Sequence, residues 1–203
     1  MIYEMKPKRY SKAHGIPGLA ELVCSNSLKS TMIENASGLL KEEMRLMGSL
    51  VLEAARAVSV PAGASLAVDR ALFSSYVTNA LEKAGVSVIR DEITEIPDAR
   101  PLIIATGPLT SDAFASSISA FIGSEGLYFY DAVAPIVLAA SIDMDRAFMA
   151  SRYGKGDPDY LNCPMTEPEY QRFFEALIAA DTVTRRGFEE ERSFQACMPI
   201  EAM

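Results

Sequence analysis

The sequence of 203 residues has no tryptophan, one histidine and three cysteines. The cysteines, Cys24, Cys163 and Cys197, are far apart, and no C-x-x-C pair is present. A zinc site is not expected, because structural zinc is held by clusters of Cys and His at short spacings. We expect free thiols, which are either buried structural residues or reactive groups.

Long apolar runs are also missing. The longest stretch, from Ala132 to Ala140, is interrupted by Pro135, and it is shorter than the ~18 residues that cross a bilayer. The basic residues near Met1 are not followed by the apolar segment of a signal peptide. We therefore expect a soluble, cytoplasmic protein.

The chain also lacks an excess of basic residues. Its 19 Lys and Arg face 27 Asp and Glu, for a formal net charge of -8. This balance opposes general nucleic-acid binding, which a basic surface normally drives. Binding to RNA would have to rest on a local patch.

The residues that are present favour a folded chain of one large domain or two small ones. Hydrophobic residues make up 49% of the sequence, enough for a sizeable core. Apolar periodicity predicts helices over 37–58, 69–84, 111–121 and 167–180, and a short helix over 143–150. Strands are predicted at 1–5, 86–89, 92–96, 101–106, 127–131, 134–138, 160–163 and 192–197, with a polar loop over 151–159.

These elements indicate an α/β fold. The apolar strand at 101–106, its glycine turn and the capped helix after it have the βα order of a buried parallel sheet. We predict an incomplete nucleotide-binding, Rossmann-like domain over residues 1–124. Residues 125–203 are predicted to form an α+β insertion, or substrate domain.

Two positions suit a nucleotide. Glu4 ends a strand, where an acidic residue accepts hydrogen bonds from ribose hydroxyls, although an ordinary solvated carboxylate is the alternative. The G-x-G-x-x-G turn that would hold a pyrophosphate is absent from the sequence. Thr106 and Gly107 form either a turn that lets a cofactor approach the backbone or a tight turn without a ligand.

Two further groups suit catalysis or binding. Cys24 lies beside Ser25 and Asn26, whose polar groups could stabilise a thiolate, and Cys197 is followed by an acidic residue. Arg152, Tyr153 and Lys155 form a basic and aromatic cluster that suits a phosphate or an unstacked base, with a solvated loop as the alternative. Spacing alone ranks no cysteine above the others.

Ten segments in one order resemble the methylenetetrahydrofolate–tRNA-(uracil-5-)-methyltransferase family, relatives of larger tRNA-modifying flavoproteins. The resemblance covers essentially the whole chain. The segments are YEM at 3–5, AELVCSNSL at 20–28, GLLKEEM at 38–44, VPAG at 60–63, LAVDR at 66–70, ATGPLT at 105–110, YFYD at 128–131, SRYGKG at 151–156, YLNCPM at 160–165 and CMPIE at 197–201.

The resemblance implies a flavoprotein that methylates tRNA. In the family, FAD receives a one-carbon unit from methylenetetrahydrofolate and, with electrons from NAD(P)H, passes it to C5 of a T-loop uridine. The family's two implicated cysteines match Cys24 and Cys197. We assign Cys197 as the nucleophile towards uracil and Cys24 as the flavin-side partner or proton acceptor.

The resemblance also places the other site residues. The cofactor site would contain Glu4, Met5, Lys6, Thr106 and Gly107. The tRNA would be contacted by Arg152, Tyr153 and Lys155. Metal ligands are not expected.

The chain differs from the family pattern at both ends. It begins at the strand of Glu4 and stops after the Cys197 segment, so it looks like an internal fragment without the pyrophosphate turn. We expect weak or no FAD binding, no methyl transfer by this chain alone, and homo-oligomers formed through exposed sheet edges. The alternatives are a non-catalytic truncated module that self-associates or binds a partner, and an FAD-dependent oxidoreductase unrelated to RNA.

Overall fold

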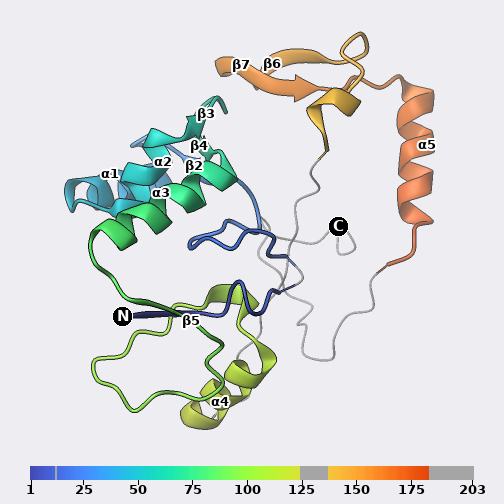
Figure 1. Cartoon of the computed structure of the whole chain (residues 1–203). Helices are drawn as coiled ribbons and strands as arrows, with labels where there is room; N and C mark the ends of the chain where they lie inside the picture. Colours follow the sequence, from blue (N-terminus) through green and yellow to red (C-terminus); the bar gives the residue numbers. More distant parts are fainter. Residues whose placement is uncertain (12, 124–136, 183–203) are drawn as a thin grey trace. The chain divides into compact units, whose positions relative to one another are not determined.

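The computed structural model describes residues 1–11, 13–123 and 137–182 (Figure 1). The chain divides into two compact units, Met1–Ala134 and Pro135–Met203. The domain boundary that we predicted at residues 124–125 lies outside the described residues. Each unit is a separate body with its own elements, and together they give a mixed α/β chain.

The first unit contains a parallel pair of strands, β1 (Ile2–Glu4) and β5 (Val88–Arg90). Both were predicted from the sequence within two residues. The register pairs Ile2 with Val88 and Glu4 with Arg90. The carboxyl ends of both strands therefore lie at the same edge of the sheet.

A three-stranded antiparallel sheet, not predicted from the sequence, lies in the same unit. Its order is β2 (Ser27–Ser30), β4 (Ser65–Val68) and β3 (Ser59–Val60). The segment between residues 60 and 65 joins β3 to β4. These strands are too short for apolar alternation to reveal them.

The single helix predicted over 37–58 is wrong, because two helices occupy that range. They are α1 (Ala36–Leu46) and α2 (Leu50–Ala57). Gly48 separates them with φ of +74°, a left-handed conformation that glycine adopts at low cost. The apolar spacing continues across the break, which is why periodicity alone did not show it.

Helix α3 (Arg70–Lys83) begins and ends where the sequence predicted. The Asp69 side chain caps its start by accepting a hydrogen bond from the amide of Leu72, at 2.9 Å. Gly85 follows its end with φ of +70°. These local signals fix both ends of the helix.

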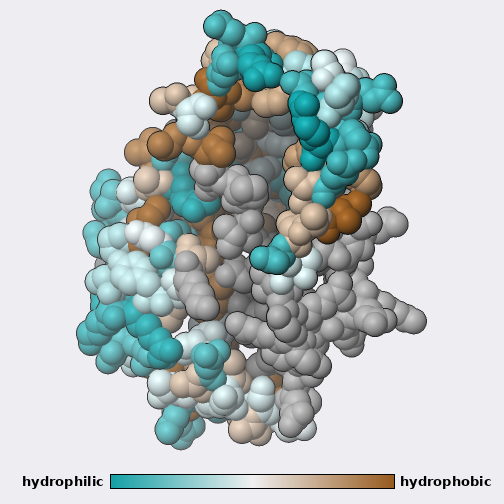
Figure 2. All heavy atoms as spheres, turned by 90° about the vertical axis from the view of Figure 1, so that its right-hand side faces the viewer, coloured by the Kyte–Doolittle hydropathy of each residue, from teal (hydrophilic) through white to brown (hydrophobic). Residues whose placement is uncertain are grey.

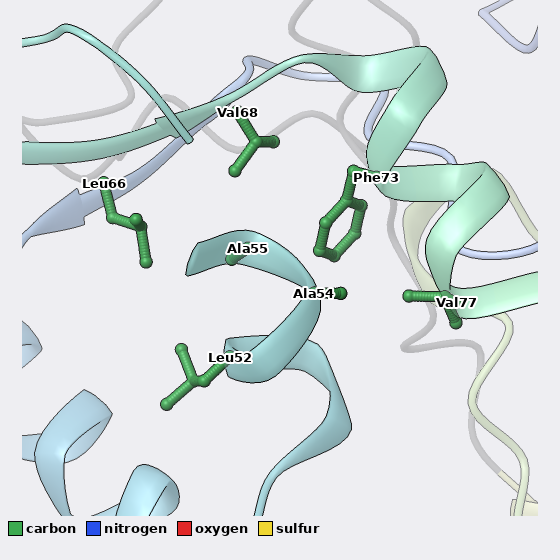
Figure 3. Close-up of a cluster of buried hydrophobic side chains, with 7 residues drawn as sticks. All are labelled: Leu52, Ala54, Ala55, Leu66, Val68, Phe73 and Val77. Carbon is green, nitrogen blue, oxygen red and sulfur yellow. The ribbon is translucent and has the colours of Figure 1, made fainter. Parts of the chain in front are cut away.

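The core of the first unit lies between α2, α3 and β4. In Figure 3, side chains from these three elements point toward one another. The buried cluster consists of Leu52, Ala54, Ala55, Leu66, Val68, Phe73 and Val77. Burial of such side chains is the main favourable term in folding.

The strands predicted at 92–96 and 101–106 are wrong, since neither segment pairs with another strand in the described chain. Ile103 is 86% exposed instead of buried. A segment with strand propensity forms a strand only where a neighbouring strand supplies hydrogen-bond partners. The local sequence does not show whether such a neighbour exists. The helix after this segment, α4 (Asp112–Ile122), is confirmed, with the hydroxyl of Ser111 accepting the amide of Phe114.

The second unit contains a hairpin and a helix. Strands β6 (Phe148–Arg152) and β7 (Lys155–Asn162) pair antiparallel. The short helix predicted over 143–150 and the loop over 151–159 are therefore wrong. The polar composition of the hairpin is typical of a loop, but pairing between the two strands outweighs this local preference. The strand predicted at 160–163 forms the end of β7.

Helix α5 (Glu167–Ile178) is confirmed, and Thr166 and Glu169 form a capping box at its start. It has no buried residue. Figure 2 shows hydrophobic side chains at the surface of the described chain. The strand predictions at 127–131 and 192–197, and most of 134–138, fall outside the described residues.

In the part of the chain that is described, every helix is too short or too polar to span a bilayer.

Candidate functional site

The carboxyl edge of the β1–β5 pair carries the first predicted site residue. Glu4 is half-buried, and its Oε1 accepts a hydrogen bond from the amide of Lys6 at 3.0 Å. The paired residue on β5, Arg90, donates through Nη1 to the carbonyls of Lys6 at 3.2 Å and Pro17 at 3.0 Å. Both strand ends therefore hold the loop that follows β1.

A buried ion pair lies inside this loop. Lys6 Nζ donates to Glu21 Oε2 at 3.1 Å and to the carbonyl of Gly18 at 2.8 Å. The two side chains are only 2% and 1% exposed. The Lys6 ammonium is thus engaged inside the protein, although the sequence placed Lys6 in the cofactor site.

Backbone amides complete the surroundings of the Glu21 carboxylate. Gly15 donates to its Oε1 at 2.8 Å and Ile16 at 3.1 Å. Burial raises the pKa of Glu21, but these amides and Lys6 lower the pKa by more, so the net shift is downward. The carboxylate is therefore stabilised in its charged form.

Helix α3 holds the middle of the loop. Ser74 Oγ donates to the carbonyl of Leu19 at 2.7 Å, and the amide of Leu19 donates to Thr78 Oγ1 at 2.9 Å. A Cβ at Gly18 would overlap Ser74 Oγ, so the loop can approach the helix this closely only with glycine there.

Cys24 lies just after this loop, and it is exposed. Its neighbours do not act as the thiolate donors suggested by the sequence. Ser25 Oγ donates to the carbonyl of Ser27, and Asn26 Oδ1 accepts from Arg70 Nε at 3.2 Å. Across the described residues, no hydrogen bond reaches the Cys24 sulfur.

Thr106 and Gly107 lie at an exposed turn at the start of a short 3-10 helix, Gly107–Leu109. Thr106 Oγ1 lies 2.6 Å from Thr110 Oγ1, which donates to the carbonyl of Gly107 at 2.8 Å. Gly107 has φ of +67°, with open space where a Cβ would stand. The turn is open enough for a ligand to approach the backbone.

The predicted RNA-binding residues lie at the tip of the β6–β7 hairpin in the second unit. Arg152 and Lys155 are register partners, and the two residues between them make the turn. Tyr153 and Gly154 both have positive φ, +54° and +67°, as a type I′ turn requires. An aromatic residue in this region is uncommon, and Tyr153 is 88% exposed.

The structure thus brings some predicted residues together. Glu4 and Lys6 share one hydrogen-bonded loop, and the buried pair links them to the segment of Cys24. Cys163 is exposed, and Cys197 lies outside the described residues. Among the described residues, no group of His, Cys, Asp or Glu could hold a metal ion.

Sequence reasoning missed Glu21 and Arg90. Glu21 lies between the apolar residues Ala20 and Leu22, and Arg90 is followed by two acidic residues. Only the tertiary fold shows that Glu21 is buried against Lys6, and no local signal could have found it. Arg90 could have been suspected from its place at a strand end.

A small cavity of about 110 Å³ lies between α1, α2 and β4. Burial, and then the charge of Lys29, lowers the pKa of Lys41 there, and its Nζ donates to the carbonyls of Ser30 and Ser37. The cavity contains none of the predicted site residues. It is lined by Thr31, Ile33, Gly38, Lys41, Glu42, Leu52, Arg56 and Leu66.

The parallel strand pair, its clamped loop and the exposed cysteine define a mixed α/β protein with a candidate site at a strand end. Residues 4–203 match the family described as Glucose inhibited division protein A. The chain therefore belongs to this family.

Curated relatives resemble the chain over its whole length. It is 57% identical over 205 residues to the methylenetetrahydrofolate–tRNA-(uracil-5-)-methyltransferase TrmFO of Geobacter sulfurreducens. It is 54% identical over 203 residues to the protein of that name in Caldicellulosiruptor bescii, and 57% over 204 residues to that in Geotalea uraniireducens. In each case all of this chain is covered, but only 47% of the relative. The chain spans about half the length of the curated relatives it matches.

Proposed function

We propose that this chain carries part of the active site of an FAD- and folate-dependent methyltransferase that acts on C5 of the T-loop uridine in tRNA. The observation that carries the proposal is the similarity of the whole chain to relatives named for methylenetetrahydrofolate, tRNA and uracil C5. The exposed thiol of Cys24, beside a structured strand-end loop, supports it.

The residues fit one edge of an FAD site. Glu4 Oε1 is used by Lys6, but its Oε2 has no hydrogen-bond partner among the described residues and can accept a ribose hydroxyl. Met5 continues from Glu4, and Thr106 and Gly107 supply the open turn. FAD, when bound, supplies the redox chemistry that moves the one-carbon unit from methylenetetrahydrofolate, with electrons from NAD(P)H.

The two family cysteines would have different roles, and only Cys197 would attack the uracil ring. The thiolate of Cys197 adds to C6, and the electron pair of the C5–C6 π bond makes C5 nucleophilic. After C5 gains its new carbon, a base removes the C5 proton and the thiolate leaves, which restores the double bond. Cys24 is assigned as the flavin-side partner or proton acceptor.

The hairpin tip would contact the tRNA. The target base must leave its stack before reaction, and an exposed aromatic ring such as Tyr153 offers it a stacking surface. Arg152 and Lys155 supply positive charge for phosphate in a chain of net charge -8. The same proposal places the protein in the cytoplasm, where tRNA is modified.

A second candidate function is a non-catalytic module that self-associates. Among the described residues, the outer edges of β1 and β5 pair with no further strand. The side chain of Ile103 is 86% exposed. Open edges and exposed apolar side chains favour association between copies.

The test is cysteine replacement in a protein of the relatives' full length that contains these residues. Cys197→Ala should lower tRNA methylation roughly 10³-fold or more while FAD stays bound, because the attacking thiolate is lost. Cys24→Ala should also impair methylation. Cys163→Ala, which removes another exposed thiol, is the matched control and should keep activity. Undiminished methylation by Cys197→Ala would refute the assignment.

A further inference from the structure

The loop between β1 and Cys24 contains an ion pair shielded from water. Lys6 and Glu21 are 2% and 1% exposed. Burying charges is costly unless they are paired and hydrogen-bonded. Here the carboxylate accepts hydrogen bonds from Lys6 and from the amides of Gly15 and Ile16, and the ammonium also donates to Gly18.

One end of this pair is fixed to the parallel strands. The amide of Lys6 donates a hydrogen bond to Oε1 of Glu4, which is the last residue of β1. The carbonyl of Lys6 accepts a hydrogen bond from Arg90, which is the last residue of β5. The Lys6 backbone is therefore held by the carboxyl ends of both strands.

The other end of the pair leads to Cys24. Leu22, which follows Glu21, packs against the buried cluster of the core. Beyond Cys24, the carbonyl of Asn26 accepts a hydrogen bond from the amide of Val68 in β4. The side chain of Asn26 accepts a second hydrogen bond from Arg70. Cys24 is exposed on a short segment that is anchored on both sides.

We infer that Lys6 and Glu21 are positioning residues: the buried pair fixes the segment of Cys24 relative to the carboxyl end of β1. The catalytic meaning of this arrangement rests on the proposed function, in which Glu4 and Cys24 serve one site. Reacting groups must be held within about 0.5 Å of their productive geometry. The Cys24 side chain has no hydrogen bond of its own in the described structure, so its anchors supply this order.

The experiment measures the mobility of a nitroxide label on Cys24 in this chain, with Cys163 and Cys197 replaced by serine. Electron paramagnetic resonance should show a restricted label in the parent. Lys6→Met and Glu21→Gln should each lose the restricted component. Lys6→Arg, which keeps the charge and donors, should retain much of it.

Two controls separate positioning from general stability. Lys8→Met removes the exposed Lys8–Asp91 ion pair of the same loop, whose side chains are 62% and 58% exposed, and should leave the label unchanged. A second label at Glu82→Cys on α3, in a Cys24→Ser background, should stay ordered in the Lys6 and Glu21 variants. A mobile α3 label would show that the Lys6→Met variant is unfolded. In that case the Glu21→Gln variant provides the test, because glutamine keeps an oxygen acceptor for the loop amides.

A restricted Cys24 label in folded Lys6→Met or Glu21→Gln would overturn the inference. Failure of this inference can be distinguished from failure of the proposed function. An unchanged label together with loss of methylation in Cys197→Ala would reject the positioning role alone. A released label together with undiminished methylation in both cysteine variants would reject the proposed function and keep the structural role of the pair.

Discussion

Lys6 shows how burial changes what a charged residue can do. The family resemblance placed it in the cofactor site, but its ammonium donates to Gly18 and Glu21 inside the protein. Glu4, by contrast, keeps one carboxylate oxygen without a protein partner among the described residues. Residue type and place in the chain predicted Glu4 as a candidate. The partner of Lys6 could not be predicted, because Glu21 meets it only in the folded loop.

Gly18 offers a test of the close packing between this loop and α3. Gly18→Ala should destabilise the protein by about 1–3 kcal/mol, the usual cost of forcing an extra carbon into a packed site. The added Cβ would overlap Ser74 Oγ. Denaturant unfolding of this chain would measure the change.

Gly15→Ala is the control for that measurement, because the nearest atom to its added Cβ is Glu21 Oε1 at 3.9 Å, an ordinary contact. Equal stability losses in the two variants would show that the loop does not pack as described.

Elements differ in how far local sequence specifies them. Helix α3 carries its own start and stop signals, and the structure confirms both. The apolar segment at 101–106 has strand composition without a neighbouring strand in the described chain, and it is not a strand. A helix forms its hydrogen bonds within itself, whereas a strand depends on a partner strand that can lie far along the chain.

The cap of α3 is the element-level prediction. Asp69→Ala should lower the free energy of unfolding by about 0.5–2 kcal/mol, because the amide of Leu72 loses its acceptor at the helix start. Asp69→Asn, which keeps a side-chain oxygen, should cost much less. Thermal or denaturant unfolding followed by circular dichroism would measure both. A loss as large in Asp69→Asn would mean that the charge, and not the cap, is important.

At the scale of the whole molecule, the predicted site residues are distributed over two units. Glu4, Cys24 and the Thr106–Gly107 turn belong to the first unit, and the Tyr153 hairpin tip belongs to the second. The first unit has a buried hydrophobic cluster, while α5 in the second has no buried residue. Stability arguments therefore apply most directly to the first unit.

The whole-molecule prediction concerns FAD. This chain of 203 residues should bind FAD weakly, because its sequence contains no G-x-G-x-x-G turn to place a pyrophosphate at a helix start. Titration followed by flavin fluorescence would measure the affinity. Tight, stoichiometric binding would contradict the prediction and would mean that other residues hold the pyrophosphate. Glu4→Ala should weaken any binding observed, whereas Lys8→Ala, at an exposed ion pair, should not.

The sequence by itself determined the family, the mixed α/β class, the ends of α3, α4 and α5, and the candidate residues Glu4 and Cys24. These depend on local composition, capping and residue order, which the chain carries everywhere along its length. Only the tertiary structure decided the β2–β4–β3 sheet, the hairpin around Tyr153 and the burial of Lys6 against Glu21. Each of these depends on contacts between segments. The free energy of such contacts comes from burial and pairing that no single segment possesses before the chain folds.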